Sequence, residues 1–305
     1  MRIGCGLPQA GKLTGPAALV DVATGAEELG YDDVWVFDRV LWPLEPRAPY
    51  PASPDGKLPE AVKTVLDPLT VLAFVAARTR RVGLGTSVLN LPFYNPVLLA
   101  RQLTAIDVLS GGRLRLGLGT GWSPDEFEAV GAPTRVLRRR TDEALQVLKA
   151  IWTRDPVAFS GEHYHVPHSY IGPKPVQKPH PPIYFAAYTS AALERVAREA
   201  DGWMPAGLPI ATVQQMFAGL QEESRRAGRD PSCLELIVRA NLWLTDTPLG
   251  PRRAVFTGSL DEIAADIAAT RGIGAHGIIL DAQSAPQART TEGLLRLMEA
   301  LRELC

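Results

Sequence analysis

Eight short apolar segments recur along the 305 residues, and each is followed by a segment with the apolar spacing of a helix. This alternation predicts parallel strands covered by helices. The predicted strands are residues 2–7, 33–37, 81–88, 114–118, 182–187, 202–205, 234–243 and 277–280. The predicted helices are residues 16–29, 67–79, 95–109, 135–152, 190–200, 212–227, 259–272 and 291–304. Eight regular units favour an α/β fold of the closed (β/α)8 TIM-barrel type over a doubly wound sheet.

The segment 81–122 shows this alternation most clearly. Asn95 followed by Pro96 predicts a helix start, since Asn caps free N–H groups and Pro fits the first turn. The helix is expected to end at Gly111-Gly112, because glycine adopts the left-handed cap conformation without strain. The flanking strands end in small residues, which suit a ligand held close to backbone: Thr86-Ser87-Val88 and Gly119-Thr120-Gly121.

Two long proline-rich segments interrupt the pattern, one after the second strand and one after the fourth. They cover about residues 40–66 and 155–182, and we expect one barrel domain over residues 1–305 that carries both as insertions. Loops of this length inside a compact domain are usually functional. The apolar and proline content of 40–66 indicates a hydrophobic substrate at the pocket mouth.

Charge and composition exclude several classes of function. The formal net charge of −1 gives no electrostatic basis for binding nucleic acid or an anionic membrane. No apolar run reaches the ~20 residues of a membrane span, and because a strand is predicted from residue 2 we expect no signal peptide. The three cysteines form no CxxC pair, so a cytoplasmic location is expected.

In a TIM barrel the active site lies at the carboxyl ends of the strands. Asp38-Arg39 ends the second strand, where a charged pair indicates function; the alternative is a salt bridge at the barrel rim. Thr189-Ser190 begins the helix after the fifth strand. Its free N–H groups suit a phosphate, but a simple helix cap is an equally good interpretation.

Two other motifs point to weaker hypotheses. Gly117-x-Gly119-x-Gly121 resembles a dinucleotide-binding loop, but the first strand lacks it and no helix is expected in this loop. The histidines 163, 165 and 168 lie in a proline-rich loop without a carboxylate pair or cysteine nearby. We therefore predict no metal site.

Six segments, in order along nearly the whole chain, together resemble one known family. They are TSVLNLPFYNPVLLA, LSGGRLRLGLGTGW, FSGEHYHV, PKPVQKPHPPIY, ADGW and GRDP. This combination is similar to the bacterial luciferase-like monooxygenase superfamily, and most of all to its oxidoreductases that use the deazaflavin coenzyme F420.

The resemblance implies a flavin or deazaflavin ring at the strand carboxyl ends. A bulge in the third strand, with a non-proline cis peptide, would back the ring at Thr86-Ser87-Val88, and Ser87-Val88 is the expected bond. Insertion 155–182 would help to cover the site, and the family commonly forms homodimers through barrel helices. The other implied cofactor contacts are Gly119, Thr120, Gly121, Ala186, Ala187, Thr189 and Ser190.

The sequence departs from these relatives at two positions. Many end the second strand in Asp-His, with the His as a candidate proton-transfer group, whereas this chain has Asp38-Arg39. Arginine stays protonated, so Arg39 is expected to orient an anionic group instead; the alternative is that the chemistry needs no acid at this position. A Gly-Gly pair is replaced by Ala186-Ala187-Tyr188, where Tyr188 would stack on a ring or fill space.

Three functions are consistent with these features. The leading hypothesis is hydride transfer between F420 and a small organic substrate, with Asp38, Arg39 and Tyr188 as catalytic candidates. The second is an FMN-dependent monooxygenase that receives reduced flavin from a separate reductase. The third is a degenerate barrel that binds a metabolite or partner without redox chemistry.

Overall fold

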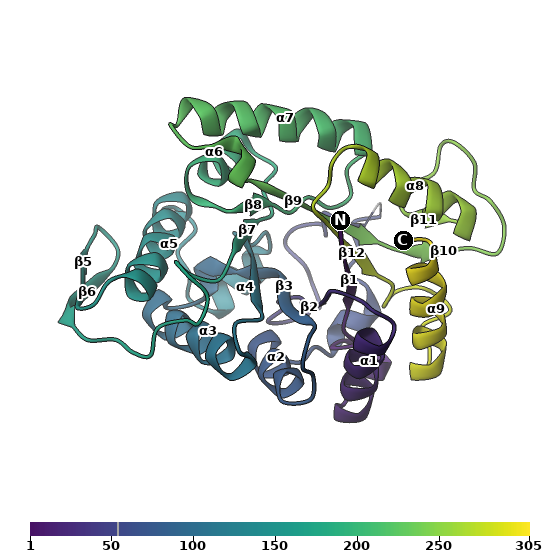
Figure 1. Cartoon of the computed structure of the whole chain (residues 1–305), viewed down its shortest axis with the longest axis horizontal. Helices are drawn as coiled ribbons and strands as arrows, with labels where there is room; N and C mark the ends of the chain where they lie inside the picture. The colour runs from purple at the N-terminus through teal and green to yellow at the C-terminus, as the bar shows by residue number, and fades with distance from the viewer. Residues whose placement is uncertain (54) are drawn as a thin grey trace.

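The computed structural model describes residues 1–53 and 55–305. Eight parallel strands close into a barrel in the order β1-β12-β9-β8-β7-β4-β3-β2, surrounded by helices (Figure 1). The barrel strands are β1 (Arg2–Gly6), β2 (Asp33–Val36), β3 (Gly83–Asn90), β4 (Leu114–Gly119), β7 (Ile183–Phe185), β8 (Gly202–Trp203), β9 (Glu235–Asn241) and β12 (Gly277–Asp281). The predicted TIM barrel is confirmed.

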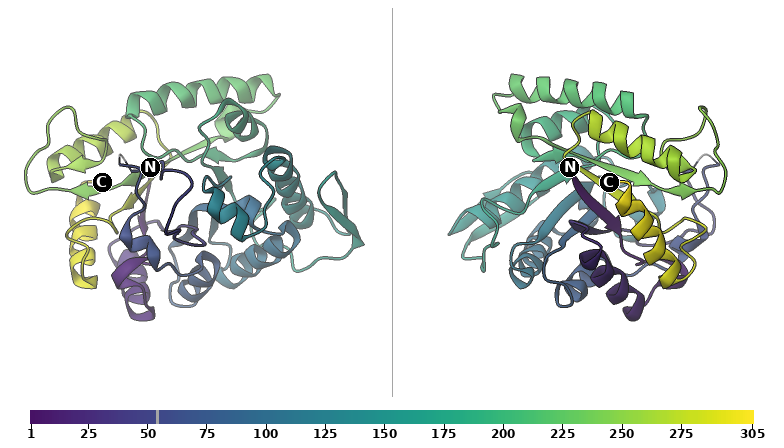
Figure 2. Two further views of the ribbon diagram at one scale, coloured as in Figure 1. Left: turned by 180° about the vertical axis from the view of Figure 1, so that it is seen from behind. Right: turned by 45° about the vertical axis from the view of Figure 1, so that its right-hand side comes forward.

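Helices follow the strands as the alternation predicts, and the two chain ends lie near each other (Figures 1 and 2). The helices are α1 (Pro16–Glu28), α2 (Pro68–Ala76), α3 (Pro96–Ser110), α4 (Pro124–Ala129), α5 (Leu137–Thr153), α6 (Ser190–Glu199), α7 (Ile210–Arg226), α8 (Leu260–Gly272) and α9 (Thr291–Glu303). The Asn95 side chain accepts from two backbone N–H groups of α3, and Gly111 ends that helix at φ +72°. Within the described residues, no helix is long and apolar enough to cross a membrane.

Large side chains fill the barrel interior. Trp35, Tyr184, Met204, Ile237 and Ile279 form a buried cluster, against which Val88 packs. Trp35 projects from β2, and its indole ring lies over Gly4 of β1 and Gly85 of β3. Both neighbouring strands therefore carry glycine where the indole needs room.

Charged groups close the amino-terminal end of the barrel. Arg2 of β1 pairs with Asp33 of β2 at 2.8 Å, and Arg115 of β4 pairs with Glu235 of β9 at 3.1 Å. Arg115 also donates to the Tyr184 hydroxyl. Because this end lies opposite the strand carboxyl ends, the network serves stability.

Insertion 40–66 joins the carboxyl end of β2 to α2, so it lies at the barrel mouth. It contains the short 3-10 helix η2 (Glu60–Lys63), and Val65 bridges to Ala10. Its residue Pro54 lies outside the described residues. The segment is therefore placed at the mouth by the topology, and a role in lining a pocket stays a prediction.

Insertion 155–182 does not cover the site, so the expectation drawn from the resemblance is wrong. The segment joins the end of α5 to the start of β7, and such a connection returns to the amino-terminal ends of the strands. Gln177 donates to the Leu114 carbonyl at the start of β4, 2.7 Å away. The segment also contains a hairpin, β5 (Val157–Ser160) with β6 (His165–Ser169), which projects at the edge of the molecule beyond α5 (Figure 1).

The loop after Gly121 holds the short helix α4, although no helix was expected there. Ser123 is its cap and Pro124 its first residue. A small parallel pair outside the barrel, β10 (Trp243–Leu244) with β11 (Thr257–Gly258), was also not predicted.

Candidate active site

The third strand has a bulge at the predicted position. The register between β3 and β4 shifts between Thr86 and Leu89, and the Ser87-Val88 peptide is cis. The Thr86 hydroxyl donates to the Gly117 carbonyl at 2.8 Å, and Ser87 is buried. The expected bulge and cis bond are confirmed, and this backbone lies at the barrel mouth.

Asp38 lies directly against this bulge. Its backbone N–H donates to the Val88 carbonyl at 3.2 Å, and its carboxylate Oδ2 accepts from the Asn90 N–H at 2.9 Å. Burial raises the pKa of the Asp38 carboxyl to about 6, although the bonds from Asn90 and the Tyr94 hydroxyl act against this rise. Asp38 is therefore a buried acid that can hold or release a proton near neutral pH.

Arg39 is engaged by a partner that the sequence analysis missed. Its Nη1 donates to Glu126 of α4 at 3.0 Å, and only 8% of the Arg39 side chain and 1% of the Glu126 side chain are exposed. The guanidinium carbon lies 5.2 Å from the Trp122 ring centre and 5.9 Å from the Tyr50 ring centre. The salt-bridge interpretation therefore describes the contacts of Arg39. Its buried Nε has no hydrogen-bond partner among the described residues.

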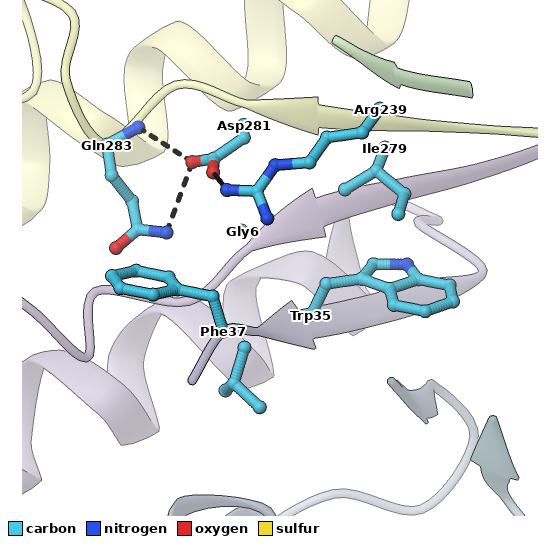
Figure 3. A pocket seen from close by; sticks show the side chains of 8 residues that line it. Gly6, Trp35, Phe37, Arg239, Ile279, Asp281 and Gln283 are labelled. Carbon is cyan, nitrogen blue, oxygen red and sulfur yellow. Dashed lines mark hydrogen bonds and ion pairs between the residues drawn. The ribbon is translucent and has the colours of Figure 1, made fainter. Parts of the chain in front are cut away.

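Arg239 is a second functional candidate that the sequence analysis missed. It lies on β9, donates to the Ser87 carbonyl and pairs with Asp281 at the end of β12. Arg239 and Asp281 line a narrow recess, too small to admit a water molecule, together with Gly6, Trp35, Val36, Phe37, Ile279 and Gln283 (Figure 3). The available signal was a single arginine within the otherwise apolar run 236–240.

The glycines of the fourth strand make room for the bulge. A Cβ on Gly119 would lie 2.6 Å from Cγ2 of Val88. Gly121 has φ +76°, and a Cβ there would lie 2.9 Å from the Phe127 ring. Thr120, between them, is half-buried. This loop is thus fitted closely to β3 and α4.

The end of β7 carries Ala186 and Ala187 in place of a glycine pair. Ala186 is half-buried and Ala187 is buried, while Tyr188 is 50% exposed. The Tyr188 hydroxyl accepts from the Ala206 N–H at 2.9 Å, which ties the ends of β7 and β8 together. Tyr188 therefore fills space between two strand ends.

Thr189 and Ser190 are exposed at the start of α6. The Thr189 hydroxyl accepts from the Ala192 N–H at 3.3 Å, so it acts as a helix cap. The remaining N–H groups of this first turn point out of the helix end, where they can bind an anion. The helix-cap interpretation is confirmed, and the phosphate interpretation stays a prediction.

The histidine-rich loop has a structural explanation. Within the described residues, Glu143, Glu162 and His163 come close enough together to share an ion. However, Glu143 already accepts from the N–H groups of Glu162, His163 and Tyr164, at 2.9, 2.9 and 3.1 Å. Its carboxylate therefore closes the hairpin turn.

Comparison with known proteins gives consistent results along the chain. The model of the family described as luciferase-like monooxygenase matches residues 1–254. An uncharacterized protein of Mycobacterium tuberculosis is 32% identical over 211 residues, which are 69% of this chain and 72% of that protein. A protein of Kineococcus radiotolerans named F420-dependent glucose-6-phosphate dehydrogenase is 32% identical over 241 residues, 76% of this chain and 66% of its own.

Solved structures share the whole fold. The monooxygenase RslO1 from Streptomyces bottropensis has a TM-score of 0.79 at 26% identity. The match covers 99% of this chain and 98% of that protein's chain. An F420-dependent secondary alcohol dehydrogenase has a TM-score of 0.76 at 18% identity, over 98% of both chains, which is a likeness of fold alone. From the family match, the barrel and the bulge, we conclude that the chain belongs to the luciferase-like monooxygenase family.

Proposed function

We propose that this chain is an oxidoreductase that transfers a hydride between coenzyme F420 and a small organic substrate. The observation that carries the proposal is the buried Asp38 carboxyl set against the Ser87-Val88 bulge at the barrel mouth. The relatives named F420-dependent glucose-6-phosphate dehydrogenase support the choice of cofactor. Bound here, the cofactor would supply hydride chemistry, and the protein would supply position and a dry pocket.

The residues present suit such a cofactor. Thr86, Ser87 and Val88 would hold the ring, with Gly119, Thr120, Gly121, Ala186 and Ala187 around it. Within residues 1–53 and 55–305, the buried Gln283 Oε1 has no hydrogen-bond partner, so this acceptor suits an N–H group of a ligand. Thr189 and Ser190 would meet a phosphate at the start of α6.

Within this proposal, each candidate side chain has a separate task. Asp38 takes or returns the substrate proton, since its raised pKa lies near neutral pH. Arg39, paired with Glu126, holds Trp122 and orients the substrate through Nε, a donor that no described residue engages. Tyr188 closes the side of the pocket at the ends of β7 and β8.

A second candidate function is an FMN-dependent monooxygenase supplied with reduced flavin by a separate reductase. The observation that favours it is the likeness to a Streptomyces bottropensis monooxygenase at 26% identity over nearly the whole chain. Oxygen consumption with supplied reduced FMN would distinguish this activity from hydride transfer.

Separate titrations of the purified protein with F420 and FMN, followed by cofactor fluorescence, test the choice. We expect tight F420 binding and little FMN binding. The opposite preference would favour the monooxygenase. Binding of neither would favour a barrel without redox chemistry, and the oxidoreductase proposal would be abandoned.

We also propose a cytoplasmic homodimer formed through barrel helices. The exposed apolar side chains Leu98 and Leu109 on α3, 57% and 75% exposed, support such a contact. Light scattering coupled to size-exclusion chromatography measures the mass directly, and a monomer at all concentrations would refute it.

A further inference from the structure

Arg239 reaches across the barrel mouth from the strand opposite the bulge. In the closed ring, the path from β9 to β3 passes β8, β7 and β4 in one direction and β12, β1 and β2 in the other. Nη1 of Arg239 nevertheless donates to the Ser87 carbonyl and lies 3.3 Å from the Ser87 hydroxyl. The guanidinium therefore lies beside the backbone where the proposed cofactor would be held.

Each of the three guanidinium nitrogens of Arg239 has a hydrogen-bond partner. Nε donates to Asn241 Oδ1 at 2.9 Å, Nη2 donates to Asp281, and the Phe37 ring centre lies 6.0 Å from the guanidinium carbon. The side chains of Arg239 and Asp281 are 18% and 12% exposed. A planar fork held in this way has a defined position relative to any ligand.

The Arg239–Asp281 ion pair places its positive member next to the bulge. Asp281 is held from its far side by the Gln283 backbone N–H at 3.3 Å and the Gln283 side-chain amide at 3.1 Å (Figure 3). Gly6 makes room for this group, because a Cβ there would lie 2.6 Å from Asp281 Oδ1. The cation thus contacts the bulge, while the carboxylate lies behind it at the end of β12.

We propose that the Arg239–Asp281 pair makes this site prefer the more negatively charged form of the ring. The inference rests on the proposed function. A hydride carries two electrons and one proton, so a ring that accepts it gains one unit of negative charge, and the substrate carbon that gives up the hydride is oxidised. A fixed cation beside the ring stabilises that form, and partial exclusion of water strengthens the interaction.

The two members of the pair have opposite effects, which gives the proposal a sign test. Arg239→Met removes the cation, so the affinity for the reduced cofactor should fall more than the affinity for the oxidised one. Asp281→Asn leaves the cation without its counter-charge, so the preference for the reduced form should rise. Arg239→Lys keeps the charge without the fork, and the preference should be largely retained.

The experiment measures the dissociation constants of oxidised and reduced F420 without oxygen, by fluorescence and absorbance, for each variant. For Arg239→Met we expect the ratio of the two constants to shift about tenfold, which corresponds to about 30 mV in the potential of a two-electron couple. Arg253→Met is a matched control, because Arg253 pairs with Asp266 at 2.6 Å beside β11 and α8. It should leave the ratio unchanged.

Equal losses of affinity for both forms, or shifts of the same sign in Arg239→Met and Asp281→Asn, would overturn the proposal. Circular dichroism and melting temperature identify a misfolded variant. If Arg239→Met misfolds, the ratio of dissociation constants measured for Arg239→Lys tests the proposal. Failure of the unmodified protein to bind F420 would refute the proposed function instead.

Discussion

At the scale of single residues, Asp38 gives the site a dependence on pH. Burial raises its carboxyl pKa from 3.8 to about 6, so the folded state holds this proton more tightly than the unfolded chain does. The contribution of Asp38 to the free energy of unfolding is therefore largest at low pH. It falls between about pH 4 and about pH 6, by an amount on the order of 3 kcal/mol, and is constant above.

Asp38→Asn removes this titration, while the amide oxygen can still accept the Asn90 N–H bond. We expect the stability of the variant relative to the unmodified protein to rise between about pH 4 and about pH 6 and to stay level above. Urea unfolding at a series of pH values measures the difference. Parallel curves for the two proteins would show that Asp38 does not titrate in this window.

Arg39 and Glu126 form a pair whose members depend on each other. Arg39→Met leaves the Glu126 carboxylate, 1% exposed, without its cation. Loss of one partner from a buried pair costs about 3–5 kcal/mol, so a large loss of stability is expected. The double variant Arg39→Met with Glu126→Gln should recover most of it, because Gln can still accept from the Val40 N–H.

Urea unfolding of the two single variants and the double variant gives the interaction energy. A stable Arg39→Met protein that merely binds an anionic ligand less well would assign Arg39 to ligand binding alone.

At the scale of elements, insertion 40–66 is joined to α4 by Arg47. Its Nε pairs with Asp125 at 2.7 Å, and Nη2 pairs with Glu128 at 2.7 Å and donates to the Pro124 carbonyl at 2.8 Å. We expect Arg47→Gln to speed amide hydrogen exchange across 41–53 and 55–60 while the barrel strands keep their protection. Lys63→Gln is the control, since it removes a pair to Glu60 within the same insertion. Equal protection in Arg47→Gln and the unmodified protein would show that other contacts hold the segment.

The sequence could predict the elements that carry their own local signals. The predicted cap at Asn95 is present and begins α3 where expected. The helix expected over 259–272 is also present, and a capping box of Ser259 and Glu262 begins it. The helix α4 was missed because it has only six residues, although Ser123 followed by Pro124 and Glu126 is a helix-start pattern. The hairpin β5–β6 was missed because its strands are short and pair mainly with each other.

At the scale of the whole molecule, the strand ends were predictable but the contacts between them were not. Topology alone placed Asp38, Ser87 and Gly119 at the mouth, because all carboxyl ends of a barrel meet there. Ser87 and Arg239 lie 152 residues apart, and nothing local links them. Arg39 and Glu126 lie 87 residues apart, and nothing local links them either. Such partners come together only when the barrel closes. The pattern of a single segment therefore does not predict them.

Closure of the barrel also depends on Trp35, whose indole fills the space between three neighbouring strands. A Cβ on Gly85 would overlap the six-membered part of the indole, and a Cβ on Gly4 would overlap its Nε1 side. Gly85→Ala should therefore lower the free energy of unfolding by about 1–3 kcal/mol through overpacking.

Trp35→Leu alone should cost about 3–5 kcal/mol, the usual range for loss of a large buried side chain. In the double variant the added methyl group enters the space that the indole leaves, so the total loss should be smaller than the sum of the two single losses. Urea unfolding of the four proteins gives this coupling. Simple additivity would mean that the strands move apart to accept the methyl group, and that the indole does not set the spacing of β1, β2 and β3.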